Sequence, residues 1–158
     1  MSIEKDINQQ KFRNEHQKSV INMIYTYNWM MEHVKNMLEK FDVTPQQFNI
    51  LRILRGAGEP LSTLQIRQRM LDKMSDTSRI VDRLVKKSLV KKVVCESDRR
   101  LVDVTISPKG LELLNQSDTY EDEMDAIFQQ LSETEAHTLN KLLDKIRNSA
   151  WKEIALPA

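Results

Sequence analysis

Residues 75–110 constrain the fold more than any other segment of this chain. Their first half reads as a helix with Arg and Lys residues along its polar side, and two strand-like runs follow at residues 90–95 and 101–106. The turn between the runs contains Arg99 and Arg100, so the predicted β-hairpin ends in two guanidinium groups. A basic helix can enter the DNA major groove, and arginine is attracted to the negative potential of the minor groove. This order of elements is typical of a winged helix that holds duplex DNA.

The distribution of charge along the chain supports an anionic partner for this segment. The 158 residues carry a net charge of only +1. Residues 61–110, however, hold 12 Lys and Arg against 6 Asp and Glu, a net charge of +6. Residues 111–158 hold 4 against 10, a net charge of −6. A basic middle beside an acidic tail indicates that the middle binds a polyanion.

Composition argues against several other classes of protein. The polar start is no signal peptide, and no apolar run approaches the length of a membrane span, so we expect a soluble, cytoplasmic protein with no membrane partner. The three His residues and the single Cys lack the spacing of metal ligands, and three Gly residues are too few for a phosphate-cradling loop. No nucleophile–base set is recognisable. We therefore expect no metal, no cofactor and no enzyme activity.

The N-terminal part of the chain contains a long amphipathic pattern. Apolar residues recur at steps of four and three from Val20 to Phe41, and a second apolar stripe is formed by Met23, Met30 and Met37. A helix of this length seldom buries two stripes within a small domain. We therefore expect a homodimer, in which a helix of a second copy covers this surface.

Capping signals divide the middle of the chain into short helices. Thr44 with Gln47, and Ser62 with Gln65, have the spacing of capping boxes. Ser75 is expected to cap the next helix. The inner face of that helix is predicted to be Thr77, Ile80, Val81 and Leu84. Two short helices joined by a tight turn form a helix-turn-helix.

Two more helices complete the prediction. Ser107-Pro108 begins a long helix that runs to Phe128, and Ser132 with Glu135 begins the last one. The pattern as a whole predicts a mainly α fold, an α+β winged helix. It has six helices, a two-stranded β-wing between the fourth and fifth, and a helical dimerisation region from both ends of the chain.

Three local sequences resemble the MarR family of winged helix-turn-helix bacterial transcriptional regulators. They are residues 44–51, residues 78–110 and the start of the last helix, Leu131-Ser132 with Glu135 and Leu139. The first matches the family's second helix, and the second contains its recognition helix and wing. The resemblance extends over nearly the whole chain, roughly from Val20 to Ile146.

Two residues depart from the family pattern. Ser88 stands where the family usually has Gly, so the turn after the recognition helix must adopt a positive φ at some cost or be built differently. Arg67 replaces a small residue in the third helix, where it adds a phosphate contact or only an exposed charge.

The resemblance implies a single domain over residues 1–158. Within it, residues 44–108 form a DNA-binding lobe, and residues 10–41 and 109–152 form the dimerisation region. The implied function is a homodimeric, sequence-specific transcriptional regulator bound to a pseudo-palindromic operator, a repressor released by a small, often aromatic, effector. The alternative from another class is a winged helix used only for protein–protein contact, against which the basic helix and arginine-tipped hairpin argue.

Candidate DNA-binding residues lie opposite the apolar face of the fourth helix and at its N-terminus, from which Ser75, Thr77 and Ser78 are expected to reach phosphates or bases. Most faces of this kind are merely solvated, but a following arginine-tipped hairpin favours DNA contact. Arg79 is the expected base reader because arginine is the usual bidentate partner of guanine. Lys86 is expected to contact phosphate or solvent. The candidates on this helix are Ser75, Asp76, Thr77, Ser78, Arg79, Arg83 and Lys86.

The candidates in the wing are the three residues of its turn. The family resemblance assigns the minor-groove role to Arg100 and gives Asp98 the task of orienting it, since a nearby carboxylate can hold a guanidinium in a fixed direction. A pair between Asp98 and Arg99 that braces the wing is compatible with that role.

Two other groups of residues leave alternatives open. Tyr25, Trp29 and His33 line a cavity for a small aromatic effector, or they pack at the dimer interface. Cys95 acts as an oxidant sensor or is inert. The neighbouring Glu96 and the lack of a second cysteine disfavour a reactive thiolate.

Overall fold

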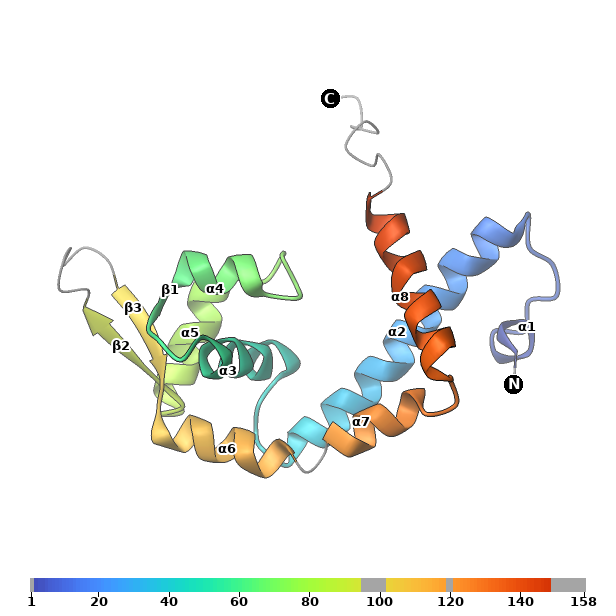
Figure 1. Cartoon of the computed structure of the whole chain (residues 1–158). Helices are drawn as coiled ribbons and strands as arrows, with labels where there is room; N and C mark the ends of the chain where they lie inside the picture. Colours follow the sequence, from blue (N-terminus) through green and yellow to red (C-terminus); the bar gives the residue numbers. More distant parts are fainter. Residues whose placement is uncertain (1, 95–101, 119–120, 149–158) are drawn as a thin grey trace, which may run out of the picture. The chain divides into compact units, whose positions relative to one another are not determined.

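The computed structural model describes residues 2–94, 102–118 and 121–148 as mainly helical, with a three-stranded sheet (Figure 1). The chain divides into two compact units, residues 1–116 and 117–158. The elements are α1 (Ile3–Asp6), α2 (Glu15–Glu39), α3 (Pro45–Ala57), β1 (Leu61–Ser62), α4 (Thr63–Arg69), α5 (Thr77–Lys86), β2 (Val90–Val94), β3 (Val102–Ile106), α6 (Pro108–Asp118), α7 (Glu121–Phe128) and α8 (Glu133–Asn148).

The predicted fold class is confirmed, with two additions and one division of a helix. A short helix, α1, precedes α2, and a short strand, β1, precedes α4. The helix expected over residues 108–128 is described as α6 and α7, and the residues between them lie outside the described part of the chain.

The short helix α1 is held to α2 by an ion pair. In α1, Ile3 is buried, and the Lys18 ammonium of α2 lies 2.5 Å from the Glu4 carboxylate. The hydrogen bond from Lys18 lowers the pKa of Glu4 to about 2.

Reciprocal side-chain bonds begin the helices that the sequence predicted. The Gln47 amide donates to Thr44 Oγ1 at 3.2 Å, and the Thr44 amide donates to Gln47 Oε1 at 3.1 Å. Ser62 and Gln65 make the same pair at the start of α4. At the start of α8 the Ser132 amide donates to the Glu135 carboxylate at 2.9 Å. These capping boxes satisfy amides that the first helical turn leaves unpaired.

The hydrophobic core of the first unit lies among α3, α4, α5 and the sheet. Ile50, Leu51, Ile66 and Leu84 are completely buried there, and Leu38 joins them from the end of α2. Because each of these helices is short, most of its stability comes from this shared core and not from its own propensity. The core therefore holds α5 in a fixed position against α4 and the sheet.

The sheet is antiparallel, with β3 in the centre and β1 and β2 on its two sides. Leu61 of β1 pairs with Val104 of β3, and Val90 of β2 pairs with Ile106. The expected two-stranded wing is thus joined by a third strand that leads directly into α4. Leu61, Val90 and Val104 point into the core, so the base of the wing and the helix-turn-helix share one hydrophobic body.

The start of α6 packs tightly against the turn that follows α5. Ser107 Oγ donates to the Ser88 carbonyl at 2.7 Å and accepts from the Gly110 amide at 3.0 Å. A Cβ atom on Gly110 would lie 2.3 Å from the Leu89 carbonyl oxygen and 2.9 Å from Ile106 Cγ1. Only glycine therefore allows α6 to approach the backbone of Leu89 this closely.

Ser88 has φ 60, so the turn out of α5 does adopt the positive φ that a glycine would accept more easily. Ser88→Gly should raise the free energy of unfolding by about 0.5–1 kcal/mol, because relief of the left-handed strain exceeds the added freedom of the unfolded chain. Urea unfolding measures the change. Ser19→Gly, within α2, is the matched control and should lower stability by about 0.5–1 kcal/mol. Equal losses in both variants would contradict the strain at Ser88.

Candidate nucleic-acid interface

Helix α5 has one buried face and one charged face. Thr77, Val81 and Leu84 are buried, and Ile80 and Val85 are half-buried against the core. The opposite side exposes Ser78, Arg79, Asp82, Arg83 and Lys86. The helical period of 3.6 residues separates these two sets, as the sequence predicted. One side of α5 therefore anchors the helix, and the other presents its charges to solvent.

The start of α5 differs from the prediction. Asp76, not Ser75, is the N-cap: its Oδ1 accepts a hydrogen bond from the Arg79 amide at 3.1 Å. Ser75 Oγ instead donates to Asp72 Oδ2 at 2.6 Å. This hydrogen bond, followed by one from the Met74 amide, lowers the pKa of Asp72. The Ser75 hydroxyl is thus hydrogen-bonded within the preceding turn, and the prediction that Ser75 caps α5 is wrong.

Polar contacts also fix the turn between α4 and α5. Asn49 of α3 accepts from the Leu71 amide at 3.0 Å, across 22 positions of sequence, and Asp72 accepts from the Met74 amide at 3.0 Å. Because hydrogen bonds rather than burial hold this turn, its apolar side chains face outward. Leu71 is 87% exposed and Met74 is 93% exposed.

Several basic side chains near α5 are engaged within the protein. Lys92 of β2 lies 2.6 Å from the Asp82 carboxylate, and its hydrogen bond lowers the pKa of Asp82. Lys87 lies 3.0 Å from the Asp42 carboxylate. These pairs tie the middle of α5 to β2 and its C-terminal end to the loop before α3. No ion pair within the described residues engages the other basic side chains of the helix, Arg79, Arg83 and Lys86.

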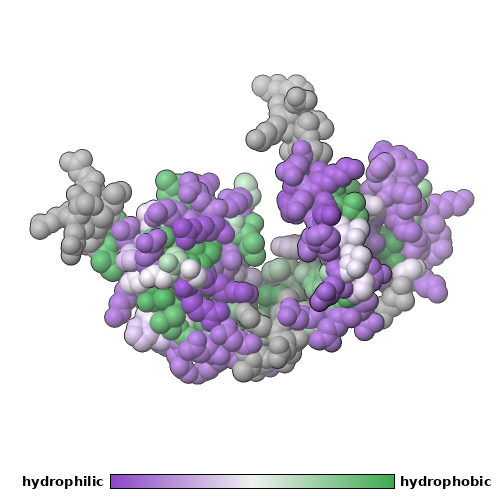
Figure 2. Space-filling model, viewed as in Figure 1, coloured by the Kyte–Doolittle hydropathy of each residue, from purple (hydrophilic) through white to green (hydrophobic). Residues whose placement is uncertain are grey.

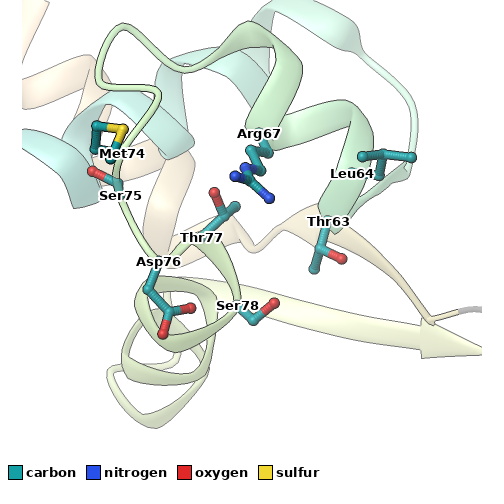
Figure 3. A pocket seen from close by; sticks show the side chains of 8 residues that line it. All are labelled: Thr63, Leu64, Arg67, Met74, Ser75, Asp76, Thr77 and Ser78. Atoms are coloured by element: carbon teal, nitrogen blue, oxygen red, sulfur yellow. The ribbon is translucent and has the colours of Figure 1, made fainter. Parts of the chain in front are cut away.

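A recess of about 380 Å³ opens between α4 and the start of α5 (Figure 3). Thr63, Leu64 and Arg67 line it from α4, and residues 74–78 line it from the turn and α5. It brings together four of the predicted site residues, Ser75, Asp76, Thr77 and Ser78. Leu64 and Met74 could not be predicted to line this recess, because nothing in their sequence pattern shows that they stay outside the core.

The predicted wing residues Asp98, Arg99 and Arg100 lie outside the described residues, and so does Cys95. The described part of the wing is its base. There β2 places Lys91 and Lys92 at exposed positions. The base of the wing is therefore basic on the strand that follows α5.

The predicted aromatic group on α2 is held together in part. The rings of Trp29 and His33 meet edge to face with centroids 4.6 Å apart, and Tyr25 and Trp29 are both exposed. A cavity of about 490 Å³ on α2 has a different lining: Tyr27, Asn28, Met31, Glu32, Lys35, Asn36, Glu39, Pro45 and Gln46. An effector site at Tyr25, Trp29 and His33 stays a prediction.

No group of three or more His, Cys, Asp or Glu side chains among the described residues is arranged to hold a metal ion. No helix in the described part of the chain is both long enough and apolar enough to cross a membrane.

Comparison with known proteins matches this architecture to one family. Residues 41–101 match the model of the MarR family. Across 124 residues the chain is 29% identical to the HTH-type transcriptional regulator MhqR of Bacillus subtilis. The matched segment covers 76% of this chain and 83% of MhqR.

Solved structures show the same fold. A mutant of MarR from E. coli, complexed with operator DNA, superposes with a TM-score of 0.76 at 22% identity, covering 87% of this chain and 99% of that one. BpsR of Bordetella bronchiseptica, whose DNA binding is regulated by 6-hydroxynicotinic acid, superposes with a TM-score of 0.72 at 20% identity, covering 83% and 99%. The relatives are transcriptional regulators and not enzymes. The chain is thus similar in sequence to transcriptional regulators of the MarR family, whose model matches residues 41–101, and it has the winged helix fold of the solved MarR structures.

Proposed function

We propose that this regulator is a cytoplasmic homodimer that reads a pseudo-palindromic operator with α5 and represses transcription until a small ligand releases it. One observation carries the proposal: α5 is anchored in the core on one side and presents Arg79, Arg83 and Lys86 on the other, without ion pairs among the described residues. Cations already neutralised within the protein would contribute little to phosphate or base contact. Unpaired cations on a rigid helix are suited to both.

The apolar surface of α2 supports the dimer. Val20, Ile24 and Tyr27, at steps of four and three, are each more than half exposed in the single chain. In the second unit, α8 likewise exposes Leu139, Leu142 and Ile146. On each helix, exposed apolar surface of this kind is typical of a protein–protein interface. With two-fold symmetry, two copies of α5 would meet half-sites about one DNA turn, roughly 10 bp, apart.

Release by a ligand is proposed from the aromatic surface of α2 and from the relatives. BpsR is regulated by 6-hydroxynicotinic acid, an aromatic acid. Trp29 and His33 already form an aromatic pair beside the exposed Tyr25, and a flat ring would stack on such side chains. An aromatic effector bound at α2 would act on the helix that forms the proposed dimer.

Selection of tight-binding duplexes from a random library, followed by salt-titrated affinities, tests sequence reading. Arg79→Ala should cost about 1–3 kcal/mol on the selected site and relax preference at one position per half-site, because it removes a bidentate contact to a base. Lys86→Ala should weaken all sequences alike and lower the salt slope by about one, since it removes a phosphate contact. Arg100→Ala should weaken sites with A·T-rich flanks most.

Two outcomes would count against the proposal. Equal losses for all three variants on every duplex would mean that α5 and the wing supply only charge. If the wild-type protein enriches no sequence from the library, DNA is not its partner.

A further inference from the structure

We propose that the recess between α4 and α5 holds one phosphate of the DNA backbone, gripped by Arg67 and Thr77, and this inference rests on the proposed DNA binding. Figure 3 shows the side chains that line it: Arg67 enters from α4, and Thr77 enters from the first turn of α5. Arg67, on the helix before α5, would then help to position the DNA.

The hydroxyl of Thr77 is buried beside the recess. This side chain is only 5% exposed, and its Oγ1 has no hydrogen-bond partner. A buried polar atom without a partner is costly, and native proteins rarely keep one without a function. Thr77 lines the recess, so rotation of its side chain toward the recess would let the buried hydroxyl donate to a phosphate oxygen seated there.

Arg67 brings a positive charge to the recess. Arg67 is exposed, and no ion pair among the described residues engages its guanidinium. Its planar group can donate two parallel hydrogen bonds to a phosphate. The positive end of the α5 dipole lies on the same recess and also favours an anion.

The carboxylate of Asp76 also lines the recess, and its negative charge would repel a phosphate. Asp76 Oδ1, however, already accepts the hydrogen bond from the Arg79 amide at 3.1 Å. In Figure 3 its carboxylate points away from Arg67. The remaining polar lining side chains, Thr63, Ser75 and Ser78, carry no charge.

The size and rim of the recess favour a nucleotide backbone over a free ion. A volume of about 380 Å³ exceeds what one phosphate fills. Leu64 and Met74 stand at the rim and are 64% and 93% exposed, so both offer apolar contact to a sugar beside the phosphate. The exposed charged face of α5 continues from the same recess through Ser78 and Arg79. A duplex that lies on that face brings its backbone to this point.

Affinity for the selected duplex, measured with the full chain over a range of salt, provides the test. Arg67→Ala should weaken binding about tenfold and lower the salt slope by about 0.9, since one charged phosphate contact is lost. Arg69→Ala is the matched control: it removes the same charge from the same helix outside the recess, and we expect no change of slope. Thr77→Val should weaken binding about tenfold without lowering the melting temperature, because the hydroxyl has no partner inside the protein.

A duplex scan with single uncharged methylphosphonates locates the contact. At one position per half-site, the methylphosphonate should weaken binding by the wild-type protein and leave binding by the Arg67→Ala variant unchanged. If Arg67→Ala and Arg69→Ala behave alike and no such position exists, the inference is wrong while DNA binding stands. If inorganic phosphate saturates an Arg67-dependent site and the scan shows no position, the recess binds a free ion and the inference is again wrong. If the wild-type protein binds no duplex, the proposed function itself is wrong.

Discussion

Ile24→Glu should convert the protein to a monomer and weaken operator binding by about 100-fold or more. Ile24 is 57% exposed on α2 in the single chain, between Val20 and Tyr27 on the same helical stripe. A carboxylate in the centre of an apolar interface is desolvated without a partner, and separated subunits lose the gain from binding two linked half-sites. Analytical ultracentrifugation measures the oligomeric state, and operator titration measures the affinity.

The control places the same charge on the other side of the same helix. Asn22 is exposed and lies nearly opposite the stripe of Ile24, so Asn22→Glu should leave both dimer and affinity unchanged. A dimer that survives Ile24→Glu would show that α2 does not form the interface. If the Ile24→Glu and Asn22→Glu dimers dissociate equally, a new charge anywhere on α2 disrupts the dimer, and the effect is not specific to the stripe of Ile24.

Gly110→Ala should lower the free energy of unfolding by about 3 kcal/mol, the largest effect expected from adding one methyl group to this chain. The new Cβ would lie 2.3 Å from the Leu89 carbonyl oxygen, a backbone atom that cannot rotate away. Relief requires α6 to move off the turn after α5, which also disturbs the hydrogen bonds of Ser107 to Ser88 and to Gly110.

Gly56→Ala is the matched control for this clash. Gly56 lies within α3, and a Cβ there would meet nothing within 4 Å. Because alanine favours a helix more than glycine, this change should raise stability by about 0.5–1 kcal/mol. Thermal unfolding of the two variants should therefore shift in opposite directions. A Gly110→Ala protein as stable as the wild type would mean that α6 approaches Leu89 less closely than described.

Local signals in the sequence predicted much of the fold because they depend on neighbours three or four positions apart. Thr44 with Gln47 and Ser62 with Gln65 do begin helices, and the positive φ expected at Ser88 is present. The buried and exposed faces of α5 also follow from spacing alone. In each case the interaction that determines the structure lies inside one or two helical turns.

The features that were missed depend on contacts distant in sequence or on competition between neighbours. Ser75 and Asp76 are both good N-caps, and only the bond from Ser75 to Asp72 decides between them. β1 is two residues long and carries no alternating pattern, so its pairing with β3 could not be foreseen. The ion pair of Lys87 with Asp42 spans 45 positions and follows from the packing of α3 against α5.

The central place of β3 in its sheet has a consequence for the length of DNA that one subunit spans. β3 is hydrogen-bonded on one side to β1, which continues into α4, and on the other to β2, which follows α5. The base of the wing therefore cannot move independently of α4 and α5. A one-base-pair insertion between the bases met by α5 and the flank met by the wing would rotate the flank by about 35°. With the proposed contacts of α5 and the wing, each subunit would measure a fixed number of base steps as well as their identity.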